Sequence, residues 1–205
     1  MNDFLETINR EINEDQIYTK VFTVKENDIV VDIGSSVGIF TKQCLQNNPK
    51  YIFTVEPSQE FIPILKNEFG LNSKVTIIDS AISETTDNLI VFGESSNHKV
   101  ITFQEFIAQN KIEKIDFLKT DCEGGEYSIF VDKNINWIIK NVKYCVGEWH
   151  LGGELKEKFR YFRDRYLWLF KSYQVYSVDG VNITWSVFSE DFLNYYTEVI
   201  FHIEI

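Results

Sequence analysis

Apolar and polar residues alternate along this chain with two different periodicities, and the changes between them predict a series of strands and helices. Runs in which nearly every residue is apolar or β-branched are typical of strands covered on both faces of a parallel sheet. Stripes of apolar residues three and four positions apart follow most of these runs and indicate helices. The core strands predicted in this way are 29–33, 51–55, 75–78, 115–120 and 142–149.

Helices are predicted between and beside the strands. An apolar stripe around Ile8 predicts an N-terminal helix, and Thr102 with Glu105 forms a capping box that begins another helix. The predicted helices after the N-terminal one are 39–47, 61–69, 102–110 and 155–169. Shorter strands are predicted at 18–24, 89–92, 175–178, 183–188 and 199–205, the third and fourth joined across Asp179-Gly180.

The order of these elements predicts the fold class. Helices and strands alternate through most of the chain, and strands dominate near its end. This order is typical of an α/β fold with a doubly wound, mostly parallel sheet, helices on both faces and an antiparallel C-terminal edge. We expect one domain over residues 1–205.

Composition and charge narrow the possible partners. The chain has 20 basic and 31 acidic residues, and the net charge of −11 argues against a nucleic-acid partner, which needs clustered positive charge. No apolar run approaches the roughly 20 residues of a membrane-spanning helix, so we expect no integral membrane association. The three cysteines predict neither a disulfide framework nor a zinc site. The acidic N-terminal stretch does not resemble a secretory signal, which favours a cytoplasmic protein, and the oligomeric state stays open.

Acidic residues lie where core strands end, and ligands of open α/β sheets bind beyond those carboxyl ends. Asp32 closes the first strand, and Glu56, followed by Pro57, closes the second. An acid in the position of Glu56 can accept hydrogen bonds from both ribose hydroxyls. Between them lies a glycine loop that allows a tight turn and leads into a helix start able to hold an anion. The loop residues are Gly34, Ser35, Ser36, Val37 and Gly38.

The spacing of this loop favours one adenosine-type cofactor over another. The dinucleotide fingerprint is Gly-x-Gly-x-x-Gly, whereas Ser36 stands here where its middle glycine belongs. S-adenosyl-L-methionine has no phosphate, and acids at the strand ends suit its cationic groups while helix amides suit its carboxylate. We therefore expect S-adenosylmethionine. The alternatives are an NAD(P)-dependent oxidoreductase and a non-catalytic module that only binds S-adenosylmethionine.

The largest cluster of residues with candidate catalytic or binding roles follows the fourth and fifth core strands. Asp121, Glu123 and Glu126 place three carboxylates within six residues, which are costly to bury without partners, and we expect Lys119 to neutralise one of them. The fifth strand ends in Glu148-Trp149-His150, where Glu148 and His150 point to the same face. Histidine is the natural base near neutral pH.

These motifs resemble the FkbM-type family of S-adenosylmethionine-dependent methyltransferases. The resemblance covers about residues 27–150, and its Lys-x-Asp-x-Glu-Gly-x-Glu element is complete. The matching segments are 31–40, 55–57, 115–126 and 148–150. It implies a class I methyltransferase (Rossmann-like) fold with a seven-stranded sheet whose last strand is antiparallel, and usually methylation of an oxygen.

The resemblance also implies roles for single residues. Asp32, Gly34 and Gly38 match the family's cofactor loop, in which Ser35 and Ser36 replace the usual Ala-Asn. Glu56 matches the ribose acid, and Asp79, with Ser80 and Ala81 beside it, matches the adenine-contacting position. Asp121, Glu123 and Glu126 match the motif beside the reacting methyl group, and we expect Asp121 to contact the cofactor as well. The chain then divides into an N-terminal helix and strand (1–26), a cofactor-binding core (27–150), and a long helix with the C-terminal strands (151–205).

The predicted mechanism is an in-line displacement in which the acceptor hydroxyl is held behind the methyl group. His150 is the first candidate for the base and Asp121 the second, with Glu123 and Glu148 orienting the acceptor. A divalent cation on Asp121, Glu123 and Glu148 is an alternative, but we expect no metal, because carboxylates around a sulfonium explain the same residues. Family analogy favours a hydroxyl on a glycan or small metabolite as the acceptor.

Overall fold

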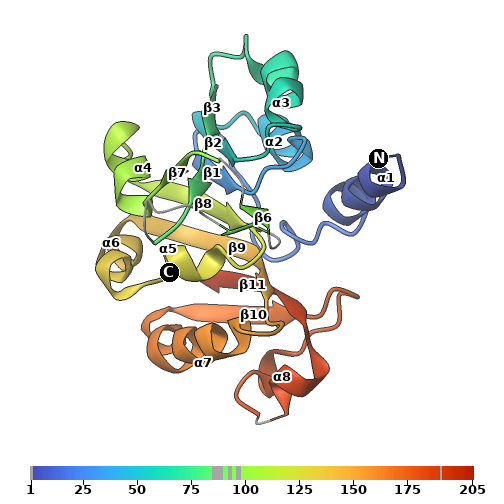
Figure 1. The fold of residues 1–205 in the computed structure, drawn as a ribbon, viewed down its shortest axis with the longest axis vertical. Helices are drawn as coiled ribbons and strands as arrows, with labels where there is room; N and C mark the ends of the chain where they lie inside the picture. Colours follow the sequence, from blue (N-terminus) through green and yellow to red (C-terminus); the bar gives the residue numbers. More distant parts are fainter. Residues whose placement is uncertain (1, 85–89, 92–93, 96–97, 190) are drawn as a thin grey trace.

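The computed structural model describes residues 2–84, 90–91, 94–95, 98–189 and 191–205. Seven strands of this part form the main sheet. They are β1 (Ile29–Ile33), β2 (Tyr51–Glu56), β3 (Val75–Asp79), β8 (Ile115–Thr120), β9 (Val142–His150), β10 (Ser172–Tyr176) and β11 (Glu198–Glu204). Their order across the sheet is β10-β11-β9-β8-β1-β2-β3 (Figure 1). β11 is antiparallel to both of its neighbours, β9 and β10, and the other adjacent strands of this sheet are parallel, which confirms the predicted fold class.

Helices cover both faces of this sheet. They are α1 (Asn2–Asn9), α2 (Ile39–Leu45), α3 (Ile62–Phe69), α4 (Phe103–Gln109), α5 (Glu126–Ile129), α6 (Asp132–Asn141), α7 (Leu155–Tyr166) and α8 (Phe192–Tyr195). A π-helical turn (Arg10–Glu14) extends α1, and 3₁₀ turns lie at Leu167–Leu169 and Thr184–Ser186. Two-residue strands form two small pairs, β4 (Ala81–Ile82) with β7 (Val100–Ile101) and β5 (Ile90–Val91) with β6 (Glu94–Ser95). None of the helices in the described ranges is long and apolar enough to cross a membrane.

Apolar residues of the core strands belong to two apolar cores, which lie on opposite faces of the sheet. Val31 and Ile33 of β1 pack with α4, α6 and α7, whereas Val30 packs on the other face with α2 and the N-terminal segment. The predicted capping box is present, because Thr102 Oγ1 accepts from the Glu105 amide at 3.2 Å and Glu105 Oε2 accepts from the Thr102 amide at 2.8 Å. The strand ends therefore have a rigid support on both sides.

Residues 18–24 do not form the predicted strand. They follow the face of the sheet as turns and irregular chain, with Tyr18 and Val24 buried in the second core and Phe22 stacked on Tyr144 of β9 at 4.3 Å. The alternation of apolar residues does reflect half-burial, but against the face of the sheet and not beside an edge strand. Of the predicted strand 89–92, only residues 90 and 91 are described, in β5, and Leu89 and Phe92 lie outside the described residues.

The C-terminal hairpin also differs from the prediction. β10 (Ser172–Tyr176) overlaps the predicted strand 175–178 only at its last two residues, and residues 183–188 contain a 3₁₀ turn in place of a strand. Tyr176 and Asn182 form a single antiparallel bridge, and then the Thr184 hydroxyl accepts the Val175 amide at 2.8 Å. A side chain thus takes the place of the backbone acceptor that a second strand would supply, and the chain is free to turn.

Candidate active site

The glycine loop between β1 and α2 touches the loop that follows β8. Gly34 has φ +75°, and a Cβ at this position would lie 1.7 Å from the Asp121 carbonyl oxygen, so only glycine fits. The Asp121 amide donates to the Ile33 carbonyl at 3.0 Å, and the Gly34 amide donates to the Val55 carbonyl at 3.0 Å. The two predicted halves of the site therefore meet through backbone contacts.

Glu56 holds the glycine loop to the end of β2. Its side chain is buried, and its two carboxylate oxygens accept from the amides of Ser36 and Ser58 at 2.8 Å each. Burial raises the pKa of Glu56, and these two amides offset part of that effect. The hydroxyls of Ser35 and Ser36 are buried without a hydrogen-bond partner in the described part of the chain. Buried polar atoms are normally hydrogen-bonded, so these two hydroxyls are available to pair with a ligand.

Asp32 is fully buried and supports the loop from behind. Its Oδ2 accepts from Thr41 Oγ1 at 2.8 Å, and its Oδ1 lies 3.3 Å from Lys119 Nζ. Lys119 Nζ also donates to the Gly34 carbonyl at 2.7 Å. The sequence predicted Asp32 as a cofactor contact. In the structure the side chain of Asp32 lies behind the glycine loop, where it pairs with Lys119, and Lys119 in turn holds the loop.

The predicted adenine side lies one strand further along the edge. Asp79 of β3 is in register with Glu56 and accepts from Gln59 Nε2 at 2.9 Å. Ser80 and Ala81 follow as buried residues that lead into β4. Asp79, Ser80 and Ala81 thus continue the row begun by the glycine loop and Glu56.

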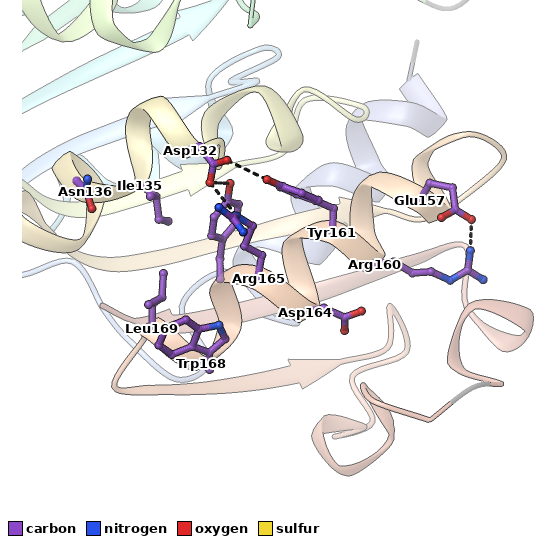
Figure 2. Close-up of a pocket in the computed structure, with 11 residues that line it drawn as sticks. Asp132, Ile135, Asn136, Glu157, Arg160, Tyr161, Asp164, Arg165, Trp168 and Leu169 are labelled. Carbon is purple, nitrogen blue, oxygen red and sulfur yellow. Dashed lines mark hydrogen bonds and ion pairs between the residues drawn. The ribbon is translucent and has the colours of Figure 1, made fainter.

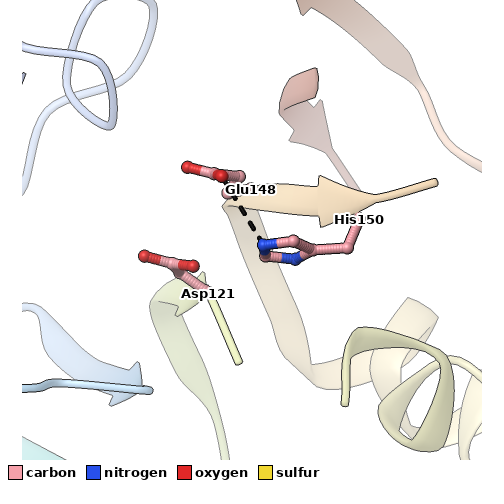
Figure 3. A group of neighbouring side chains, drawn as sticks. All are labelled: Asp121, Glu148 and His150. Atoms are coloured by element: carbon pink, nitrogen blue, oxygen red, sulfur yellow. Dashed lines mark ion pairs between the residues drawn. The ribbon is translucent and has the colours of Figure 1, made fainter. Parts of the chain in front are cut away.

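The residues predicted beside the methyl group come together at the ends of β8 and β9. Asp121, Glu148 and His150 each offer a ligand atom, and these three atoms lie within 4.8 Å of one another (Figure 3). His150 Nε2 lies 3.2 Å from Glu123 Oε2 and 3.6 Å from Glu148 Oε1, and His150 Nδ1 lies 3.7 Å from Glu126 Oε1. The prediction that Glu148 and His150 share a face agrees with this contact.

Burial and neighbouring charges shift the pKa values of His150 and Glu148. Burial alone would lower the pKa of His150, but the carboxylates of Glu126, Glu123 and Glu148 raise it to about 9. Burial and the charge of Asp121 raise the pKa of Glu148 to about 8. The raised pKa favours an imidazolium that pairs with these acids, and the role of His150 as the base stays a prediction.

Tyr18 is a site residue that sequence reasoning missed. Its hydroxyl donates to Asp121 Oδ2 at 2.7 Å, and Lys119 Nζ lies 5.2 Å from the centre of its ring. The side chain is buried, and 103 positions separate it from Asp121 along the chain. The alternation around Tyr18 indicates burial, but no sequence signal points to an acid so far away.

A large hollow elsewhere on the surface is a poor candidate for the site. It measures about 1010 Å³ and lies between α6 and α7 (Figure 2). Asp132 at the start of α6 accepts from Tyr161, Arg165 and Tyr166 of α7 at 2.9 to 3.0 Å. These contacts tie two helices together, and no residue that the sequence predicted for the site lines this hollow.

Comparisons with known proteins identify the family to which this chain belongs. Residues 28–177 match the family model described as the methyltransferase FkbM domain. The hexuronic acid methyltransferase AglP of Haloferax volcanii is 23% identical over 159 residues, which are 70% of this chain and 65% of that protein. Ribosomal RNA small subunit methyltransferase A of Clostridium perfringens is 29% identical over 112 residues, 55% of this chain and 38% of that protein. The chain thus spans less than two thirds of the length of these curated relatives.

Solved structures share the fold at low sequence identity. The methyltransferase FkbM of Methylobacillus flagellatus superposes with a TM-score of 0.59 at 15% identity, over 90% of this chain and 45% of that one. SMU.1697c of Streptococcus mutans, described as a putative methyltransferase in complex with SAH, gives a TM-score of 0.55 at 10% identity over 98% and 97% of the two chains. These matches support the Rossmann-like class I methyltransferase fold.

Proposed function

The chain belongs to the family of methyltransferases with an FkbM domain, and from this premise we propose that it methylates a hydroxyl oxygen with S-adenosylmethionine as the donor. We propose a saccharide or a small hydroxylated metabolite as the acceptor. The name of the archaeal relative, a hexuronic acid methyltransferase, supports a saccharide. The relatives that act on ribosomal RNA make a nucleic acid the acceptor class to test against it.

The observation that carries the donor assignment is the set of unsatisfied groups at the glycine loop. Ser35 and Ser36 present buried hydroxyls without partners in the described ranges, directly beside the fixed carboxylate of Glu56. An adenosine-type ligand offers the complementary polar atoms, because carboxylate oxygens retain lone pairs for ribose hydroxyls after binding two amides. We propose that the loop, Glu56, Pro57 and the row from Asp79 to Ala81 hold this ligand. When bound, it supplies an electrophilic methyl group on a cationic sulfur.

We propose that residues at the ends of β8 and β9 stabilise the sulfonium, position the acceptor and receive its proton. Asp121, Glu123 and Glu148 surround one space with negative charge, which favours a nearby sulfonium and gives the hydroxyl proton a destination. His150 lies among these carboxylates and can direct the acceptor oxygen. Because Gly34 and Asp121 are in backbone contact, the donor and acceptor ends are held at a fixed separation.

The charge of the acceptor end supports a saccharide over RNA. Five carboxylates, on Glu11, Asp121, Glu123, Glu148 and Glu198, influence one another there, with Lys119 as the buried cation beside them. A phosphate backbone would be repelled by such a surface. A neutral hydroxyl meets no such repulsion.

The test is a labelled-methyl transfer screen with the purified chain. Radioactive methyl from S-adenosylmethionine should appear in a saccharide from a panel of neutral sugars, hexuronic acids and their oligomers, and not in ribosomal RNA. Calorimetric titrations with S-adenosylhomocysteine and with NAD(H) are run in parallel. Tight binding of NAD(H) alone would replace the proposal with an oxidoreductase. Binding of S-adenosylhomocysteine with label only in RNA would keep the donor and overturn the acceptor.

A further inference from the structure

We propose that Asp121, Glu148 and His150 form a binding site for one divalent cation of the Mn²⁺ class. The sequence favoured no metal, and its alternative set used Glu123 in place of His150. The tertiary structure changes that choice, because the three ligand atoms that converge come from Asp121, Glu148 and His150. Figure 3 shows the two carboxylates and the imidazole gathered around one space at the ends of β8 and β9.

The spacing of the three atoms suits an ion. All of them lie within 4.8 Å of one another. Ligands of a six-coordinate cation at about 2.0–2.6 Å are separated by roughly 3 to 5 Å from one another, depending on whether they are adjacent or opposite. Asp121 follows one strand, and Glu148 and His150 end the neighbouring one, so the sheet itself fixes the spacing.

A second, independent observation concerns the atoms behind the ligands. Glu126 is fully buried, and its Oε1 accepts from the Cys122 amide at 2.8 Å. Its Oε2 and His150 Nδ1 are buried without a hydrogen-bond partner among the described residues, and His150 Nδ1 lies 3.7 Å from Glu126 Oε1. Metal-bound histidines almost always donate their other ring N–H to such a carboxylate, which fixes the ring and its tautomer. Glu126 facing Nδ1 leaves Nε2 on the side of Glu148, where the ion would lie.

Asp121 is oriented in the same manner. Tyr18 donates to its Oδ2, and Lys119 Nζ lies 3.8 Å from that same oxygen, so Oδ1 takes part in neither contact. Lys119 Nζ is also 3.3 Å from Asp32 Oδ1, so its positive charge is shared between the carboxylates of Asp32 and Asp121. The remaining carboxylates keep the local charge negative, which favours a cation.

The ligand chemistry selects the class of ion. Two carboxylates and one imidazole combine oxygen ligands, which suit Mg²⁺ and Mn²⁺, with nitrogen, which favours the transition metal. Three protein ligands leave coordination positions open for acceptor oxygens. This step rests on the proposed function: such an ion would let a hydroxyl, or a neighbouring carboxylate of an acidic sugar, approach a region that is otherwise strongly negative.

Binding of Mn²⁺ to the chelator-stripped full chain tests the inference without any turnover. Electron paramagnetic resonance should show loss of the free-ion signal at one Mn²⁺ per chain, with nitrogen coupling from one imidazole. Asp121→Asn and Glu148→Gln should each weaken binding at least 10-fold, and His150→Gln should also remove the nitrogen coupling. Glu126→Gln should weaken binding roughly 10- to 100-fold through the orientation of His150. Asp179→Asn, in an exposed turn, is the matched control and should bind like the parent.

Three results would overturn the metal site: no stoichiometric Mn²⁺ binding, equal binding by the site variants and the control, or bound Mn²⁺ without nitrogen coupling. Circular dichroism and S-adenosylhomocysteine titration confirm that each variant is folded. The two proposals fail separately. Absence of Mn²⁺ binding by a protein that still transfers methyl groups would overturn the ion and keep the proposed function, whereas Mn²⁺ bound at this site without transfer to any acceptor would do the reverse.

Discussion

The two halves of the candidate site satisfy their polar groups in different ways. At the ends of β1 and β2, which we call the donor half, the carboxylate of Glu56 binds backbone amides and Asp32 is paired with Lys119 behind the loop. At the ends of β8 and β9, the acceptor half, carboxylates face one another and His150. The donor half is thus shaped before any ligand arrives, whereas the acceptor half carries surplus negative charge that a proton, a cation or a cationic ligand must balance.

The largest effect is expected where the halves touch. Gly34→Ala places a Cβ 1.7 Å from the Asp121 carbonyl oxygen at a residue with φ +75°. Strain and overpacking together should lower the free energy of unfolding by about 3 kcal/mol or more. Urea denaturation measures the change. Gly152→Ala is the control, because an added Cβ there meets nothing within 4 Å. Equal stability of the two variants would mean that the halves are not locked together.

Asp121→Asn should separate the halves functionally. The substitution keeps the size of the side chain and removes a charge from the acceptor half, so kcat should fall roughly 100-fold or more. Affinity for S-adenosylhomocysteine should change little, because the donor half is intact. Single-turnover kinetics with the acceptor found in the screen, beside calorimetry, measures both quantities. A large loss of cofactor affinity with unchanged kcat would reverse the assignment of Asp121.

Glu56→Gln is the complementary change in the donor half. An amide cannot accept from both backbone amides as the carboxylate does, nor from both ribose hydroxyls, so affinity for S-adenosylhomocysteine should fall roughly 10- to 100-fold. Mn²⁺ binding should be preserved. Glu60→Gln, an exposed glutamate four residues later, is the matched control. If both variants bind the cofactor like the parent, Glu56 is not a ribose contact.

The smallest effect concerns the support of the acceptor half. His202 of β11 pairs with Val146 of β9 and is buried, and burial lowers its pKa to about 4, although the nearby backbone of Ile17 opposes this. The neutral form is favoured in the folded state, so its contribution is present above pH 6.5 and is lost as the pH falls from 6.5 toward 4. The free energy of unfolding should be lower at pH 5.5 than above pH 6.5 by about 1 kcal/mol. Urea denaturation across this range should give a flatter curve for His202→Phe, and identical slopes would contradict the assignment.

Local patterns predicted most of the fold correctly. The five core strands, the capping box and the antiparallel last strand all follow from periodicity and element order over short stretches. The wrongly predicted strands lie where a side chain or a surface replaced strand pairing, and the helices α5, α6 and α8 were not predicted. Residues 18–24 pack on the face of the sheet, and Thr184 accepts the hydrogen bond that a paired strand would have taken.

The candidate site was only partly predictable for the same reason. The sequence itself determined the strand ends, the glycine loop and the acidic motifs, because these depend on neighbouring residues and on which end of a strand they follow. Tertiary structure decided that Asp32 lies behind the loop, that Tyr18 reaches Asp121, and that His150 lies among three carboxylates. Charge and burial act through space between residues far apart in the chain, and no local pattern records those distances.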